Sequence, residues 1–392
     1  MWNLFSTLTG WAYTKQDSAF RLGLSLLLSA YSPSDREHYF RDHRFDDDNK
    51  TYYDSPRVYH HDPRHGWYFG EQVRPCLGAK ERLFGKPLSF DFRYIGARDL
   101  PSLPKVGFIT TLIIPRQFYR PIPNMGLILR SLPKLETLRY EPWDSITSNR
   151  SWRHEVNLLE ILDALPRTVT RFSGYRDSND VFNTNGTVFL FPDPGLKLFH
   201  ISQRLKELDL SFIIDAKWFF APFGKKKKNV SWDNLEGLTL TSDSLSSKAP
   251  PKEVDELLRS AAQAALRMPK LQMMELWFGQ RGEARIFCYT RFKDNSLVEW
   301  WDTSLLSATL RPNVRKSWQM VADKYVRGHL DFEVHNILPR HIKSRGSILP
   351  YLKRRDRTLT SGSLQQIIWE TTELRRVRRH APANAGAHTV QC

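Results

Sequence analysis

The sequence predicts an α/β fold, namely a leucine-rich-repeat-like solenoid with a parallel concave sheet, convex helices and a long N-terminal insertion. Two observations support this fold class. Segments in which every second residue is apolar follow segments with a helical apolar stripe, and four of the junctions combine a Leu or Met, a proline and a basic residue. This tripeptide recurs at 103–105, 132–134, 165–167 and 268–270.

Helices are predicted immediately before the prolines. Residues 157–165 place leucine or isoleucine at positions i, i+3, i+4 and i+7, which is the apolar stripe of a short helix. Residues 251–268 show the same stripe and open with a proline and early acidic residues, which suit a first helical turn. Residues 125–132 are a weaker copy. Each helix is expected to end at the following proline, because its ring clashes with the preceding turn.

Strands are predicted immediately after the prolines, where the apolar period changes from 3.6 to 2. The alternation is clearest at 137–141, 204–212, 234–242 and 270–278, and it indicates strands with one buried face. Helix and strand together repeat every 29 to 36 residues, slightly above the usual upper end of leucine-rich repeats. The first apolar residues of the units are Val106, Leu135, Val169, Leu205, Leu235 and Leu271.

Further elements are predicted on both sides of the repeats. On the N-terminal side, a short helix is expected at 4–11 and a strand with alternating leucines at 22–30. On the C-terminal side, paired strands at 284–292 and 296–301 are expected to close the array, and a helix is expected at 311–325.

The predicted domain organisation has two parts. Residues 1–335 form the leucine-rich-repeat-like domain. Residues 31–101 are an insertion within this domain, because the repeat pattern is lost there in polar, aromatic and turn-rich sequence. Residues 336–392 form a basic C-terminal extension whose last part is expected to be disordered.

The positive charge of the chain is concentrated near its C-terminus. The net charge is +16 at neutral pH. Between Arg340 and His380, eleven Lys or Arg residues stand against three acidic residues, so this segment contributes +8, half of the total. The rest of the protein is only mildly basic, which argues against the whole fold being a nucleic-acid platform.

Composition disfavours several classes of protein. Cys76, Cys288 and Cys392 lie far apart and form no C-x-x-C pair, which argues against a disulfide framework and favours a reducing compartment. The N-terminus lacks a secretory signal, and no apolar run is long enough for a membrane helix. We therefore expect a cytoplasmic or nuclear protein without a membrane partner.

No catalytic signature is present, and we predict that the protein is not an enzyme and has no cofactor. Residues 78–87 resemble a phosphate loop, but six residues separate the two glycines where four are needed. Histidines cluster at 38–43 and 60–65 without a complete ligand spacing. Solvated loop histidines are therefore favoured over a metal site.

The strand positions that face outward on the concave side are the candidate protein-binding residues. They combine both signs of charge with an exposed aromatic side chain, a mixture typical of protein-recognition surfaces. The alternative, that these residues merely solvate the sheet, is equally supported by the sequence. The candidates are Arg139, Glu141, Arg171, Asp209, Thr239, Glu275 and Trp277.

Two basic segments are candidates for nucleic-acid binding. A lysine run follows the apolar segment at 216–223 and is expected at a loop tip, where solvating charge is the favoured interpretation. The C-terminal extension has the charge to bind phosphates or an importin-type receptor, but it lacks the interleaved aromatic residues that single-strand binding needs. The candidate basic patch comprises Lys225, Lys226, Lys227, Lys228, Arg354, Arg355, Arg375, Arg376, Arg378 and Arg379.

Six segments together resemble a known family. They are AYSPSDREHYF (30–40), YEPW (140–143), LDLSFIIDAKWFF (208–220), LTLTSDSL (238–245), MPKLQMMELWFGQRGEA (268–284) and LRPNVRKSWQMVA (310–322). In matching order, over most of residues 2–330, they resemble the region after the F-box in fungal F-box domain-containing proteins of unknown specific function. The resemblance implies a leucine-rich-repeat-like fold and, by analogy, a substrate-receptor role in a Skp1-cullin-F-box ubiquitin ligase.

The resemblance does not include the F-box itself. Proteins of this family open with a helical F-box segment beginning L-P-x-E-I or similar, whereas this chain starts with MWNLFSTLTGW. No Skp1-binding residue is carried over, so Skp1 is a doubtful partner. The leading hypothesis is a non-enzymatic module that binds an unknown protein ligand. The alternative is a basic nucleic-acid-binding protein that acts through residues 225–228 and the C-terminal extension.

Overall fold

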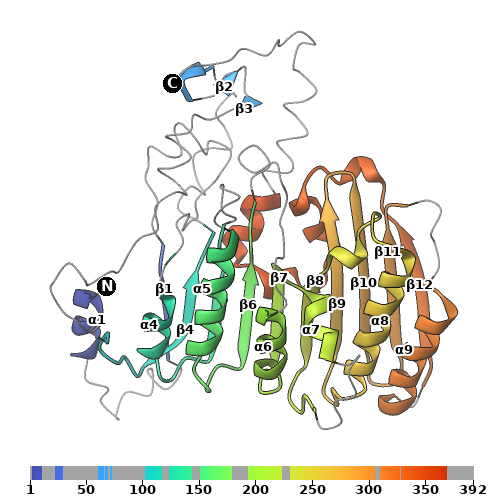
Figure 1. Ribbon diagram of the computed structural model, residues 1–392, viewed down its shortest axis with the longest axis horizontal. Helices are drawn as coiled ribbons and strands as arrows, with labels where there is room; N and C mark the ends of the chain where they lie inside the picture. The colour runs from blue at the N-terminus through green and yellow to red at the C-terminus, as the bar shows by residue number, and fades with distance from the viewer. Residues whose placement is uncertain are drawn as a thin grey trace.

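In the computed structural model, the chain forms a mixed α/β fold around one ten-stranded sheet (Figure 1). A separate two-stranded sheet is formed by residues that come, in sequence, between the first two strands of the large sheet. The structure describes residues 2–10, 23–29, 61–65, 67–68, 71–72, 102–116, 122, 124–143, 151–178, 193–222, 230–304, 310–326 and 328–368.

The large sheet is mostly parallel. Its strands follow the order β1-β4-β5-β6-β7-β8-β9-β10-β11-β12. Only β10 runs antiparallel to its neighbours β9 and β11, with which it forms tight hairpins. The strands of this sheet are β1 (Leu24–Leu27), β4 (Ile109–Ile114), β5 (Thr137–Tyr140), β6 (Arg171–Tyr175), β7 (Glu207–Asp215), β8 (Gly237–Thr241), β9 (Met273–Gln280), β10 (Glu283–Arg291), β11 (Ser296–Asp302) and β12 (Leu330–Asn336), and the small sheet pairs β2 (Trp67–Tyr68) with β3 (Glu71–Gln72).

Helices cover one face of the large sheet. Parallel strands need crossover connections, and the helices between successive strands supply them on the same side (Figure 1). None of the helices in the described part of the chain has the length and apolar character that crossing a membrane requires. The α-helices are α1 (Trp2–Thr9), α4 (Met125–Arg130), α5 (Ser151–Ala164), α6 (Asp193–Ser202), α7 (Ala216–Phe220), α8 (Pro251–Ala265), α9 (Pro312–Tyr325) and α10 (Arg355–Thr358).

The main core lies between the helices and the sheet. One register row of the sheet is apolar across successive strands, and its side chains are buried against the helices. Burying one leucine side chain of this row contributes about 1.5–3 kcal/mol to the stability of the fold. The row consists of Leu112, Leu138, Phe172, Leu208, Leu238 and Met274.

The predicted elements of the repeats are confirmed in type and order. The strands at 137–141, 204–212, 234–242 and 270–278 are β5, β7, β8 and β9. The stripe at 251–268 is α8, which ends at Ala265 before the proline. The other predicted helices correspond to α4, α5, α1 and α9, and the flanking strands to β1, β10 and β11.

One strand of the large sheet was not predicted from the sequence. β12 pairs in parallel with β11 and forms the edge of the sheet, so the β10–β11 hairpin does not close the array. Its side chains are mostly half-buried or exposed. An edge strand of this kind shows no clean apolar alternation, because only a part of either face is covered.

The predicted insertion at 31–101 lies mostly outside the described residues. β1 pairs directly with β4 even though this long segment separates them in the chain. Within the segment, the structure describes a short 3-10 helix, η3 (Pro63–His65), and the β2–β3 pair.

The segment after β12 covers the sheet face opposite the helices. We call residues 337–368 the C-terminal strap. It contains η9 (Pro339–His341), η10 (Arg345–Tyr351) and α10, and it forms a second apolar core with the sheet. The predicted C-terminal extension therefore packs on the sheet up to residue 368, and its last part lies outside the described residues. The strap contributes Ile337, Ile342, Ile348, Leu349, Leu352, Leu359, Leu364 and Ile367, and the sheet contributes Tyr175, Phe212, Trp277, Ala284 and Ile286.

Candidate functional site

A row of mainly polar side chains crosses the sheet on the face opposite the helices. The strand register aligns one residue from each strand between β4 and β12. Four of the seven candidate protein-binding residues belong to this row. We call it the polar row, and it consists of Ile113, Arg139, Ser173, Asp209, Thr239, Glu275, Cys288, Glu299 and Glu333.

Most of the candidate residues are covered by the C-terminal strap. Glu141, Asp209, Thr239 and Glu275 are buried, with at most 1% of each residue exposed. The expectation that Trp277 is an exposed aromatic side chain is wrong, because the strap encloses it in the second apolar core. Glu141, Asp209 and Glu275 bind the strap itself. The sheet face over β7 to β9 is therefore not open to a partner.

The side chain of Asp209 binds Arg354 of the strap. Arg354 Nε donates to Oδ1 at 2.7 Å and Nη2 donates to Oδ2 at 2.9 Å, a bidentate pair. The guanidinium lies directly over Gly237, where a Cβ atom would collide with it. Burial alone would lower the pKa of Arg354, but the Asp209, Glu207 and Glu275 carboxylates together outweigh it and raise the pKa.

Glu275 holds the backbone of the strap. Its two carboxylate oxygens accept the backbone N–H groups of Lys353 at 2.7 Å and Arg354 at 2.9 Å. Burial raises the pKa of Glu275 to about 7, while these two hydrogen bonds act in the opposite direction. The ammonium of Lys353 reaches the next carboxylate along the polar row, that of Glu299.

Glu141 anchors the C-terminal end of the strap. Its carboxylate accepts the backbone N–H of Thr360 at 2.6 Å, the hydroxyl of Ser363, and the backbone N–H of Arg116 at 3.0 Å. Burial raises the pKa of Glu141, and the hydrogen bond from Ser363 is the largest opposing effect. The carboxylate therefore joins β5 to two parts of the chain that are distant in sequence.

The remaining two candidates, Arg139 and Arg171, lie at the open end of the same face. Arg139 is half-buried and donates to the carbonyl of Leu359 at 3.1 Å. Arg171 is exposed and donates to the hydroxyl of Thr137 at 3.3 Å. Neither side chain is enclosed in the way that Asp209 or Glu275 is.

Arg171 also lines an open groove at the amino-terminal ends of β4 to β7. The groove has a volume of about 450 Å³. Exposed basic side chains from three consecutive units, Lys134, Arg171 and Lys206, line it together with the exposed Glu136. Its other lining residues are Gly23, Gly107, Phe108, Thr110, Thr168 and Thr170.

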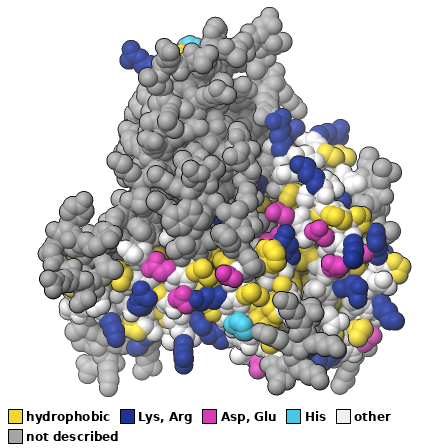
Figure 2. Space-filling model, viewed as in Figure 1, with side chains coloured by type: hydrophobic (Ala, Val, Ile, Leu, Met, Phe, Trp, Pro, Cys, Tyr) yellow, Lys and Arg dark blue, Asp and Glu magenta, His cyan; other side chains and the backbone are white. Residues whose placement is uncertain are grey.

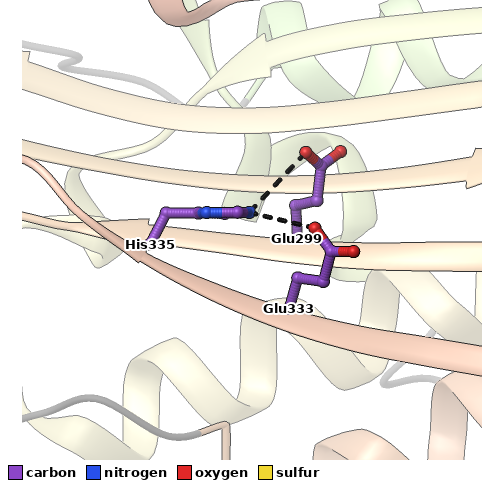
Figure 3. Close-up of side chains that lie close together, drawn as sticks. All are labelled: Glu299, Glu333 and His335. Atoms are coloured by element: carbon purple, nitrogen blue, oxygen red, sulfur yellow. Dashed lines mark ion pairs between the residues drawn. The ribbon is translucent and has the colours of Figure 1, made fainter.

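A second group of polar side chains lies at the β11–β12 edge. Glu333 is the register partner of Glu299, and His335 follows two positions later on the same face of β12. Figure 3 shows the imidazole of His335 pointing toward both carboxylates, with Nε2 3.9 Å from Glu299 and 3.3 Å from Glu333. In the part of the chain that the structure describes, these three residues form a group that could hold a metal ion.

The candidate basic patch is only partly described. Lys225–Lys228, Arg375, Arg376, Arg378 and Arg379 lie outside the described residues. Arg354 binds Asp209, and Arg355 is half-buried and donates to the carbonyl of Pro350 at 2.8 Å. Arg354 is therefore already engaged by a carboxylate of the sheet. Of the two histidine clusters, the first lies wholly outside the described residues.

The sequence analysis missed both the strap and the group at the β11–β12 edge. The strap offered one signal, since its basic residues match the acidic positions of the predicted concave face. For the edge group, the signal was Glu333-Val334-His335, because a strand places residues i and i+2 on one face. Glu299, on the neighbouring strand, is brought in only by the register.

A protein-family model matches part of the chain. The description "Family of unknown function (DUF6546)" applies to residues 164–360, half of the chain. This range begins at the end of α5 and ends within the strap, so it contains Asp209, Glu275 and Arg354. No curated protein and no solved structure matches the chain.

Proposed function

The chain belongs to the Family of unknown function DUF6546, and we propose that it is a non-enzymatic protein-interaction module whose ligand is an acidic segment of another protein. We also propose that its strand-and-helix units form a leucine-rich-repeat-like solenoid, with the polar row on the concave side. The sequential strand order and the repeat of 29 to 36 residues support this second proposal.

The observation that carries the proposal is the division of charge on the face opposite the helices. Its acidic part, with Asp209, Glu275 and Glu299, is neutralised by Lys353 and by the guanidinium and backbone of Arg354. In the described part of the chain, the basic groove lined by Lys134, Arg171 and Lys206 stays accessible at the other end of this face. The charge of the groove is therefore complementary to an acidic ligand.

The groove favours a polypeptide ligand. It spans the ends of four adjacent strands, and basic side chains line it together with Thr110, Thr168 and Thr170. Ammonium and guanidinium groups bind carboxylates, and the hydroxyls can donate to or accept from a peptide backbone. Interfaces of this kind gain specificity and association rate from charge complementarity more than raw affinity.

A nucleic-acid ligand is the second candidate, and the groove supports it less well. Single-strand binders combine basic grooves with aromatic side chains on which the bases stack. Phe108 is the one aromatic residue among the groove's lining residues, and Glu136 adds a negative charge there. A phosphate backbone would be attracted by the three basic residues, but the Glu136 carboxylate would repel it.

The test compares two triple charge reversals in the full chain. The first, Lys134→Glu, Arg171→Glu and Lys206→Glu, removes the basic groove without disturbing buried groups. The matched control, Lys252→Glu, Arg259→Glu and Lys316→Glu, changes exposed residues on α8 and α9 of the helix face. That face mixes basic and acidic side chains (Figure 2), so the control changes charge without removing a single-sign patch.

Binding is measured by fluorescence anisotropy with a poly-glutamate peptide and with a single-stranded oligonucleotide of equal charge. We expect the peptide to bind the unaltered chain and the control, and to be lost from the groove variant. Tighter, groove-dependent binding of the oligonucleotide, with the steep salt dependence of phosphate contacts, would instead establish the nucleic-acid alternative. If neither probe distinguishes the two variants, the groove is not the binding surface.

We propose that the module is similar to the substrate-recognition part of an F-box ubiquitin-ligase receptor. The support is the six-segment resemblance to fungal F-box domain-containing proteins, five segments of which lie wholly or mostly in described parts of the fold. A pull-down with purified Skp1 tests the ligase-adaptor form. Binding supports that form, whereas failure to bind restricts the proposal to a scaffold that recognises its ligand without recruiting a ligase.

A further inference from the structure

The group at the β11–β12 edge has the geometry of a metal site. One ligand atom each from Glu299, Glu333 and His335 can be chosen so that all three lie within 4.8 Å of one another. Zinc bonds of 2.0–2.2 Å to nitrogen and oxygen place tetrahedral ligands roughly 3.3–3.5 Å apart. The Nε2 distances of 3.3 Å to Glu333 and 3.9 Å to Glu299 therefore need only small side-chain movements to close around an ion.

The imidazole is held in place by its surroundings. His335 stacks on Trp301, its partner across the strands, with ring centroids 4.0 Å apart and planes inclined by 24°. Trp301 in turn packs beside Tyr351 of the strap. The stacking of His335 (β12) on Trp301 (β11) orients the imidazole ring so that Nε2 faces the two carboxylates (Figure 3).

The local charge calls for a cation at this position. The Nε2 atom is buried and has no hydrogen-bond partner among the described residues. If Nε2 carries no proton, its lone pair faces two carboxylates, and this arrangement is unfavourable. Either a proton on Nε2 or a metal ion between the three groups removes the repulsion. The ammonium of Lys353 balances one of the two carboxylates, that of Glu299, so one negative charge remains.

The donor set determines the class of ion. An imidazole nitrogen with two carboxylate oxygens suits zinc and similar first-row transition metals, whereas calcium and magnesium prefer oxygen ligands alone. Half of the Glu333 side chain is exposed, at 53%, so an ion can enter from solvent. Three protein ligands leave a fourth position for water.

We infer that Glu299, Glu333 and His335 bind a divalent transition-metal ion, with zinc the best match, and that this ion joins the edge strand β12 to β11. The ion would share the Glu299 carboxylate with Lys353 of the strap. The inference is independent of the groove and of any acidic ligand.

The experiment uses the full chain after treatment with a chelator and dialysis. Zinc content is measured by atomic absorption and the thermal midpoint by calorimetry, with and without added zinc. His335→Ala removes the nitrogen ligand. His329→Ala is the matched control. His329 forms an ion pair with Asp331 at 3.1 Å, as His335 does with its carboxylates, but both of these side chains are exposed.

We expect zinc to raise the midpoint of the unaltered chain and of the His329→Ala variant. The His335→Ala variant should hold one zinc ion fewer and show no increase. Glu333→Gln provides a second variant at a half-exposed position, in case loss of the Trp301 stack prevents folding of the first. It should weaken zinc binding by at least the roughly 10- to 100-fold that loss of an outer-sphere partner costs.

Two results would overturn the inference. One is an equal zinc content and midpoint increase in the unaltered chain and in both site variants, which would place the metal elsewhere. The other is no zinc response in any of them, which would show that a proton on His335 alone balances the carboxylates. A response to calcium or magnesium that depends on His335 would contradict the assignment of the ion class.

Discussion

Arg354 and Asp209 form a bidentate ion pair although 145 positions separate them in the sequence. The pair joins the C-terminal strap to the centre of the sheet, and its side chains are 12% and 2% exposed. A buried ion pair is weak evidence for added stability, but removal of one partner leaves an uncompensated charge. The attachment of the strap therefore depends strongly on both residues.

Substitution Arg354→Ala should destabilise the protein by about 3 kcal/mol, because it leaves the buried Asp209 carboxylate unpaired. The free energy of unfolding is measured by urea denaturation. Arg355→Ala, which removes a half-buried neighbour bonded to one carbonyl, is the control and should cost less than about 1 kcal/mol. Equal costs for the two variants would show that Asp209 does not require its partner.

Substitution Gly237→Ala should displace the Arg354 guanidinium, because a Cβ atom at this position would collide with it. The expected cost is about 1–3 kcal/mol, typical of overpacking. Gly107→Ala is the matched control, since a Cβ atom there has no neighbour within 4 Å. In a double-mutant cycle, Arg354→Ala should remove most of the Gly237→Ala effect, and simple additivity would contradict this explanation.

Ionisation of Glu275 should weaken the fold as the pH rises. Its folded pKa of about 7 lies above the ordinary value of 4.5, so protonation favours the folded state. The stabilisation is fully present below about pH 4.5 and is lost as the pH rises through about 7. The charged groups that face Glu275 are Arg354, Lys353 and Asp209.

The measurement compares urea denaturation of the unaltered chain and of a Glu275→Gln variant across this pH range. The glutamine does not titrate. The free energy of unfolding of the unaltered chain, relative to that of the variant, should therefore fall by on the order of 2 kcal/mol between about pH 4.5 and about pH 7. Asp243, whose pKa burial raises to about 6, is present in both proteins and cancels. A constant difference at all pH values would contradict the prediction.

Cys288 should report opening of the strap. It belongs to the polar row between Glu275 and Glu299, both of which bind Lys353, and it is 1% exposed. Burial raises the pKa of its thiol, which further slows reaction. In a background with Cys76→Ser and Cys392→Ser, a thiol reagent should label Cys288 far more slowly than a free cysteine.

The same labelling rate tests whether the Arg354–Asp209 ion pair keeps the strap closed over Cys288. Arg354→Ala should accelerate the reaction more than the Arg355→Ala control does, because the strap opens more often when its ion pair is lost. Rapid labelling of the unaltered chain would show that the strap does not protect this part of the polar row.

Local pattern was sufficient for the strands of the repeats and for the helices α4, α5 and α8. It was insufficient for α6, for α7 and for the contacts between distant segments. The apolar alternation that leads to β5, β7, β8 and β9 depends on neighbouring residues, as do the prolines that end the helices. The edge strand β12 was missed because its two faces are only partly covered. The proximity of His335 to Glu299 depends on the parallel pairing of β11 with β12, which no local pattern specifies.

The sequence by itself determined which residues form the strands of the repeats and the helices α4, α5 and α8, since side-chain periodicity and proline geometry act over a few positions. It also determined that Arg139, Asp209, Thr239 and Glu275 occupy equivalent strand positions. Only the tertiary structure decided what these side chains meet, because the strap that buries three of them lies 78 or more positions further along the chain. Buried carboxylates need partners, and here the partners are the chain's own lysine, arginine and backbone amides.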